Sequence, residues 1–190
     1  MLTDTFSVDP KKYFGRPETA RLPEEEACYE LLQRLQIPFA RADHDPAMTI
    51  ELCHEVEKIL GTKICKNLFL TNRQGTAFYL LLMPGDKPFK TKFLSAQLGC
   101  ARLSFAGEAA LWELMKLRPG SATVFGLLQE SAGAVQLVID KALLEEPYFA
   151  CHPCYNTSTV SFSTEDLIHK LLPAMGFTPT LVELPEVCDG

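Results

Sequence analysis

The chain has 190 residues, enough for one domain with a substantial hydrophobic core. Its apolar share (47%) and charged share (22%) are those of an ordinary globular protein, and no apolar run approaches the roughly 20 residues that span a bilayer. The net charge of −6 argues against a general nucleic-acid coat. Residues 61–118, however, carry nine basic and three acidic side chains between acidic flanks, as a local polyanion contact would need.

Residues 1–5 lack the basic and apolar segments of a signal peptide, and an odd number of cysteines, seven, argues against a disulfide framework. We therefore expect a cytoplasmic protein with free thiols. Residues 1–20 show no periodicity and are expected to form a loose N-terminal arm.

A helix is predicted from Pro23 to Leu35, because proline and three glutamates occupy its first turn and apolar residues then recur at helical spacing. A short strand is predicted at 38–42. After the following turn, Thr49 is expected to cap a helix that runs to about Leu60, with glycine after it.

The segment 67–83 contains two apolar runs around a glycine-containing turn and predicts a β-hairpin. Lys66 and Asn67 stand where its first strand begins. An unpaired ammonium beside buried strands is costly unless an anion meets it. Lys66 is therefore either a solvated lysine at a strand end or a lysine that faces the negative charge of a ligand.

The remaining elements follow from apolar runs between turn residues. Helices are predicted at about 88–98 and 107–117, a further helix from Ser163 to Gly176, a short helical turn at 143–144, and strands at 101–105, 123–128, 134–139, 157–162 and 179–184. Helices and hairpins are mixed without a βαβ rhythm. This order favours the α+β class, with a curved, mixed or antiparallel sheet.

The run Cys151-His152-Pro153-Cys154 suggests a metal or redox site. It supplies at most three of the four ligands of zinc, and a strand-like run follows where a redox motif needs a helix. We therefore expect no metal and no cofactor. His152, before a proline and near polar residues 155–159, is a candidate site histidine.

Gly120 and Gly126 bracket a run of small residues. This pattern is typical either of a helix stop before a strand or of a backbone that approaches a ligand closely.

Five motifs occur in order: Lys66-Asn67-Leu68-Phe69-Leu70, Met83-Pro84-Gly85-Asp86-Lys87, Arg102-Leu103-Ser104-Phe105-Ala106, Pro119-Gly120-Ser121 through Phe125-Gly126-Leu127, and His152-Pro153 with Asn156-Thr157. Together they resemble the YbaK/prolyl-tRNA synthetase-associated editing domain, in its free-standing form that deacylates alanyl-tRNA(Pro). The match covers about residues 22–184.

The resemblance implies a barrel-like mixed sheet flanked by helices, in one editing domain over residues 21–185 between the arm 1–20 and a tail 186–190. It implies hydrolysis of alanyl-tRNA(Pro) at the terminal adenosine, in a size-selective pocket without a metal or cofactor. The partner would be the acceptor end of tRNA(Pro), with prolyl-tRNA synthetase as a second candidate, and neither a membrane nor DNA is expected.

The resemblance also assigns candidate residues. The catalytic candidates are Lys66, His152 and Gly120, with Lys66 near the terminal phosphate and ribose. Substrate-binding candidates are Asn67, Thr49, Ser121, Phe125, Gly126 and Asn156, and the expected tRNA contacts are Arg73, Lys87 and Lys90. The G-x-x-x-P loop of the family reads Gly120-Ser121-Ala122-Thr123-Val124 here, so valine replaces its proline.

Physical reasoning supports an editing site, because a pocket built for proline cannot strongly reject alanine: a missing methylene or two is worth only about 1–3 kcal/mol. Two alternatives stay open. The first, motivated by Val124 and by the long N-terminal arm, is a catalytically silent module that binds tRNA or a synthetase. The second is editing of another residue, such as cysteine or serine.

Overall fold

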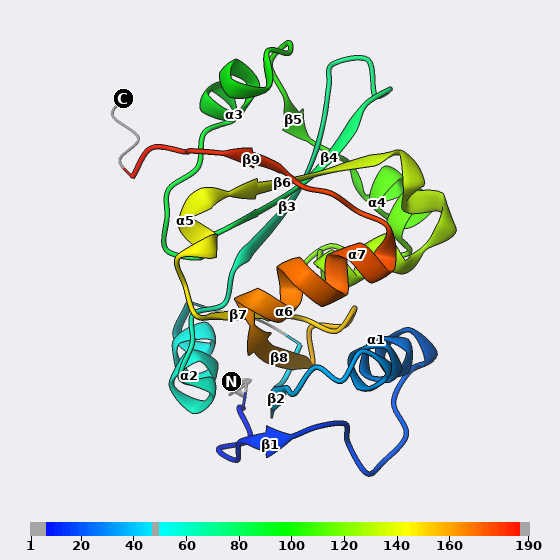
Figure 1. The fold of residues 1–190 in the computed structure, drawn as a ribbon, viewed down its shortest axis with the longest axis vertical. Coiled ribbons are helices and arrows are strands. Elements are labelled where there is room, and N and C mark those ends of the chain that lie inside the picture. Colours follow the sequence, from blue (N-terminus) through cyan, green and yellow to red (C-terminus); the bar gives the residue numbers. More distant parts are fainter. Residues whose placement is uncertain (1–6, 47–49, 187–190) are drawn as a thin grey trace, which may run out of the picture.

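The computed structural model describes residues 7–46 and 50–186, whose strands form two sheets (Figure 1). The antiparallel sheet has the order β1 (Tyr13–Phe14), β2 (Ala40–Asp43), β8 (Ser158–Ser163) and β7 (Tyr148–Cys151). The mixed sheet has the order β5 (Ser104–Phe105), β3 (Lys66–Thr71), β4 (Phe78–Met83), β6 (Val135–Asp140) and β9 (Thr180–Val182). In it, β3 is antiparallel to β4 and β5, whereas β6 is parallel to β4 and β9. The predicted α+β class with a mixed sheet is confirmed.

Helices surround and separate the sheets. They are α1 (Pro23–Arg34), α2 (Ile50–Leu60), α3 (Thr91–Leu98), α4 (Glu108–Met115), α5 (Lys141–Leu144), α6 (Thr164–Asp166) and α7 (Leu172–Met175). A π-helical segment, Leu167–Leu171, joins α6 to α7, and this continuous run lies between β6 and β8 (Figure 1). No helix in the described ranges is long and apolar enough to cross a membrane.

Strand β4 is buried on both faces, as its uninterrupted apolar sequence requires. Leu80 and Leu82 belong to the main core, which includes side chains of α1 and β8. Leu81 and Met83 face the opposite way, into a second cluster that contains Leu94 of α3. The mixed sheet is therefore covered on both faces, so we expect candidate functional sites at the ends of its strands.

Three local predictions need correction. The strand expected at 123–128 is a 3-10 helix, Val124–Leu128, because the Thr123 hydroxyl accepts the backbone N–H of Phe125 (3.4 Å) and caps a helical turn. Strand β7 was not predicted. Strand β1 lies in the expected loose arm, where Tyr13 pairs with Arg41, so the described part of that arm adds a strand to the antiparallel sheet.

Candidate active site

A pocket of about 270 Å³ lies where the start of β3 meets the turn at 118–122 and the end of β7. Its lining residues are Ile64, Cys65, Lys66, Asn67, Leu68, Gly120, Ala122, Cys151 and His152. The fold thus brings together four of the predicted site residues, Lys66, Asn67, Gly120 and His152, from three separate parts of the sequence.

Lys66 extends from the first residue of β3, and its Nζ donates to the backbone oxygen of Lys87 (2.6 Å). Gly85 allows the loop with Lys87 to lie this close, since a Cβ on Gly85 would stand 2.0 Å from the carbonyl oxygen of Ile64. Within the described residues Lys66 makes no ion pair, and the neighbouring Asp86 pairs with Lys63 instead. The ammonium of Lys66 therefore has further N–H donors available to a ligand.

Asn67 carries an unsatisfied acceptor. Its Nδ2 donates to the carbonyl oxygen (3.4 Å) and the Sγ (3.2 Å) of Cys65, whereas its Oδ1 is buried with no hydrogen-bond partner in the part of the chain described. Leaving a buried acceptor unpaired costs about 1–3 kcal/mol. A ligand with an N–H or O–H donor would remove that cost.

His152 is held in one tautomer. Its Nδ1 lies 2.9 Å from the carbonyl oxygen of Ser158, and because a carbonyl can only accept, Nδ1 carries the proton and Nε2 is an acceptor. Burial lowers the pKa of His152 to about 4, so the imidazole is neutral at neutral pH. The hydroxyl of Thr123 donates to the backbone oxygen of His152 (2.7 Å) and ties it to the turn that carries Gly120.

Gly120 has a left-handed backbone conformation, with φ of +81°. It lies in a turn that is held by a hydrogen bond from the N–H of Ser121 to the backbone oxygen of Arg118 (3.0 Å). Val124, at the place of the family proline, is fully buried in the core. The loop is thus anchored without a proline. Asn156 lies beside Gly120, because a Cβ on that glycine would be 3.6 Å from its Nδ2, and it flanks the pocket without lining it.

Two cysteines also line the pocket: Cys65, which the sequence did not single out, and Cys151, which was considered only as part of a metal or redox motif. Burial raises the pKa of the Cys65 thiol to about 12 and also raises that of Cys151. Neither is a thiolate at neutral pH, so neither is suited to nucleophilic attack. The sequence did not predict the apolar lining residues Ile64, Leu68 and Ala122 either. The only signal for them was that they lie within two residues of Lys66 or Gly120 in the sequence.

Other sequence-based candidates lie elsewhere. Phe125 is in the core, edge-on to Phe162, and Gly126 packs against Met115, so neither contacts the pocket. Ser121 is buried and does not line it.

Lys87, an expected tRNA contact, is buried and pairs with Asp140 (2.8 Å) and Glu186 (3.1 Å), which does not fit that role. Arg73 is exposed at the tip of the β3–β4 hairpin, Lys90 lines a separate basic pocket, and Thr49 lies outside the described residues.

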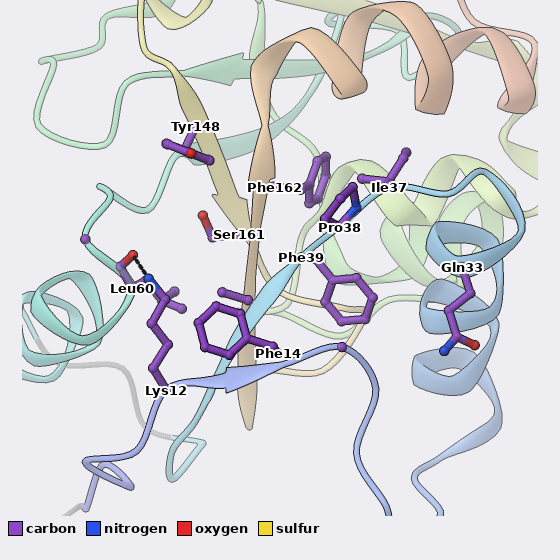
Figure 2. Close-up of a pocket in the computed structure, with 13 residues that line it drawn as sticks. Lys12, Phe14, Gln33, Ile37, Pro38, Phe39, Leu60, Tyr148, Ser161 and Phe162 are labelled. Atoms are coloured by element: carbon purple, nitrogen blue, oxygen red, sulfur yellow. Dashed lines mark hydrogen bonds between the residues drawn. The ribbon is translucent and has the colours of Figure 1, made fainter.

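A larger cavity, of about 610 Å³, lies between β1, α1 and α2. Its lining residues are drawn in Figure 2. Its wall is mostly apolar and includes Phe14, Phe39 and Phe162. The ammonium of Lys12 points to the carbonyl oxygen of Leu60 (2.9 Å). None of the predicted site residues lines this cavity, whose polar lining side chains are Lys12, Gln33, Tyr148 and Ser161, so volume alone does not identify the active site here.

Among the described residues, the small pocket combines a lysine that makes no ion pair, a neutral histidine and an amide oxygen without a hydrogen-bond partner. One cation and two acceptors suit a polar substrate that carries both a negative group and N–H or O–H donors. The chain matches the family model of the aminoacyl-tRNA editing domain over residues 44–170, and it belongs to this family. Its activity is therefore that of an aminoacyl-tRNA deacylase. No group of three or more histidine, cysteine or acidic side chains within the described ranges is placed to hold a metal ion.

The chain is 35% identical over 160 residues to the prolyl-tRNA editing protein ProX of Acetoanaerobium sticklandii, covering 84% of this chain and 97% of that protein. It is 32% identical over 149 residues to prolyl-tRNA synthetase associated domain-containing protein 1 of Bos taurus, covering 75% and 85%. A crystal structure described as a candidate trans-editing enzyme for prolyl-tRNA synthetase has the same fold, with a TM-score of 0.62 at 14% identity, over 87% of this chain and all of that one.

Proposed function

We propose that this protein hydrolyses the ester that joins alanine to the terminal adenosine of tRNA(Pro), acting in trans. The observation that carries the proposal is the convergence of Lys66, Asn67, Gly120 and His152 on one pocket of about 270 Å³. The similarity to a protein named for prolyl-tRNA editing supports the choice of tRNA.

In this proposal each group has a positioning role. Lys66 binds the terminal phosphate or ribose, since it makes no ion pair with a carboxylate of the described residues. The unpaired Oδ1 of Asn67 accepts from the amino group of the substrate or from a ribose hydroxyl. The turn at Gly120 brings backbone close to the amino group, and Nε2 of His152 accepts a hydrogen bond from water or ribose.

The reaction needs only water. The water oxygen attacks the ester carbonyl, the bond between that carbon and the ribose oxygen breaks, and the released oxygen takes up a proton. The neighbouring ribose hydroxyl assists this transfer, and bound geometry supplies much of the rate enhancement. Because the two pocket thiols are protonated and His152 is a weak base, we assign no covalent intermediate.

Size selection would come from the pocket walls. Cys65, Leu68, Ala122 and Cys151 limit the space beside the polar groups. A methyl side chain fits such a space, whereas the proline ring, fused to its own amino nitrogen, demands more room where Gly120 lies. Correctly charged prolyl-tRNA(Pro) is thus spared.

The test is deacylation of alanyl- and prolyl-tRNA(Pro) by the purified protein. We expect rapid loss of alanine and stable prolyl-tRNA. Loss of alanine at the rate seen in buffer would reject the proposal, and tRNA binding without hydrolysis would instead establish the silent binding module.

Editing of serine is a second candidate, because a serine hydroxyl could donate to the unpaired Oδ1 of Asn67. A panel of alanyl-, seryl- and cysteinyl-tRNAs separates these substrates. Asn67→Ala should reduce hydrolysis of the seryl ester more than that of the alanyl ester if serine is the preferred residue.

A further inference from the structure

A second pocket, of about 400 Å³, lies where α3 begins and β5 passes beside it, at the end of the molecule opposite β1 and α2 (Figure 1). Its lining residues are Phe89, Lys90, Thr91, Lys92, Arg102 and Phe105. Three of these side chains are cations, two are aromatic and none is acidic. We call Phe89, Lys90, Lys92, Arg102 and Phe105 the basic aromatic pocket.

The charge of this pocket is not balanced by the protein. Lys90, Lys92 and Arg102 make no ion pair within residues 7–46 and 50–186, and the first turn of α3 carries no acidic residue. Arg73 adds a fourth cation near this edge, because it follows Thr71, which pairs with Ser104 of β5.

Two other basic residues of the middle third are paired with carboxylates: Lys63 with Asp86, and Lys87, which is buried against Asp140. Lys116 and Arg118 lie over the ring of Trp112 (5.7 and 4.1 Å to its centroid), as Lys92 lies over that of Phe93 (4.8 Å), and such contacts leave the charge in place. The basic aromatic pocket thus gathers three cations of residues 61–118 that have no carboxylate partner in the described ranges.

The aromatic side chains indicate what kind of anion fits. Phe105 is 62% exposed, and its ring stands edge-on to that of Phe89, with centroids 6.2 Å apart. Single-stranded nucleic acids are bound by cations that meet the phosphates and by aromatic rings on which bases stack. An exposed phenylalanine among three unpaired cations provides both.

The strand register connects this pocket to the candidate active site. Phe105 pairs with Leu70, which lies four residues beyond Lys66 on β3, a separation of about 13 Å along the strand. Side chains alternate, so Lys66 and Leu70 point to the same face, but Leu70 is fully buried in the cluster that contains Leu94 of α3. A bound RNA strand would therefore pass around this cluster. Stacked nucleotides advance about 3.4 Å each, so roughly four of them equal the direct distance, which is the shortest path between the two pockets.

We propose that the basic aromatic pocket binds the unpaired nucleotides that precede the terminal adenosine of the substrate, while the Lys66 pocket holds the aminoacylated end. The identity of this RNA rests on the proposed function. The pocket recognises phosphates and the face of a base, not a sequence, and supplies affinity at a distance from the ester.

The experiment compares the triple variant K90A/K92A/R102A with wild type on alanyl-tRNA(Pro) and on 3′-alanyl-adenosine, which is too short to reach the basic aromatic pocket. On the tRNA we expect KM to rise at least about tenfold with kcat nearly unchanged. The slope of log KM against log salt should fall by about 2, for three lost phosphate contacts. Hydrolysis of 3′-alanyl-adenosine should not change.

A charge-matched control, K11A/K58A/K170A, removes three exposed lysines that do not line this pocket and should retain the wild-type KM. In addition, F105A should weaken tRNA binding about tenfold, whereas F105W should retain it. An equal effect of the triple variant on both substrates, or an equal loss in the control, would overturn the inference.

If the wild type hydrolyses neither substrate, the proposed function fails, and the inference is then decided by binding. A single-stranded RNA oligonucleotide should bind the wild type and the charge-matched control equally, and the triple variant at least about tenfold more weakly. Equal binding by all three proteins would reject the basic aromatic pocket as an RNA site.

Discussion

Lys66 and Lys87 meet in one contact and yet have different environments. The ammonium of Lys66 donates to the backbone oxygen of Lys87, whereas the ammonium of Lys87 is buried against Asp140 and near Glu186. A carbonyl oxygen leaves the charge of Lys66 in place, while two carboxylates neutralise that of Lys87. Both lysines occur in recognisable motifs, but their partners are distant in the sequence, so spacing could not separate the two roles.

Lys66→Ala should lower kcat/KM for alanyl-tRNA(Pro) roughly ten- to hundredfold, because one charge-assisted interaction worth about 1.5–3 kcal/mol is lost. Single-turnover deacylation measures the change. Lys58→Ala, which removes an exposed lysine of α2, is the matched control and should behave as wild type. Unchanged turnover in Lys66→Ala would exclude this lysine from the site.

His152 makes stability depend on pH. Its pKa is about 4 in the folded protein and near 6.5 when unfolded, so between these values the unfolded chain binds more protons and the folded state loses stability as the pH falls. At pH 5 the loss relative to pH 8 should be roughly 2 kcal/mol from this residue. Urea unfolding across this range measures it.

The comparison protein for that measurement is His152→Gln, which has no titrating group at this position. Burial also lowers the pKa of His44, so some decline should remain in the variant. Identical pH profiles for the two proteins would mean that His152 is not held neutral by burial.

At the scale of elements, the 3-10 helix Val124–Leu128 replaces the strand predicted there and moves Phe125 and Gly126 into the core. A Cβ on Gly126 would lie 2.5 Å from Cε and 3.0 Å from Cβ of Met115. This glycine therefore packs closely against Met115 of α4, and it does not line the Lys66 pocket.

Gly126→Ala should accordingly destabilise the protein by about 1–3 kcal/mol through overpacking, with kcat/KM per folded molecule unchanged. Chemical denaturation and deacylation assays test the two halves of this prediction. Gly133→Ala, in the 3-10 helix Glu130–Ala134, meets no atom within 4 Å and should be nearly neutral. Loss of activity without loss of stability in Gly126→Ala would restore the glycine to the site.

Elements with strong local signals were predictable. Helix α1 and the β3–β4 hairpin were confirmed almost to the residue, because caps, periodicity and turn residues lie within the segments themselves. Strands β1 and β7 were not predicted, since they have two and four residues and depend on pairing with β2 and β8. Short edge strands carry too little pattern to be recognised before their partners are known.

At the scale of the molecule, the sequence located an excess of positive charge but not its distribution. The fold pairs Lys63 and Lys87 with carboxylates, places Lys90, Lys92 and Arg102 together at one pocket and leaves Lys66 at another. The resemblance named Lys66, Asn67, Gly120 and His152, and the fold places all four on one pocket. Their geometry, and the walls formed by Cys65 and Cys151, depend on contacts between distant segments that no local pattern encodes.

Lys87 joins three such segments, since its ammonium links the loop after β4 to Asp140 at the end of β6 and to Glu186 near the end of the described chain. The side chains of Lys87 and Asp140 are 4% and 1% exposed. Lys87→Met should cost about 3–5 kcal/mol of unfolding free energy, because it leaves the Asp140 carboxylate buried and unpaired.

The control is Lys63→Met, which breaks the exposed pair with Asp86 and should change stability little. The double variant Lys87→Met with Asp140→Asn should recover part of the loss, because the uncompensated charge is then absent. Denaturant titration of all variants gives the comparison. If Lys87→Met instead keeps full stability and loses only affinity for tRNA, the lysine contacts the RNA as the sequence motif suggested, and the buried pair is not what holds these segments together.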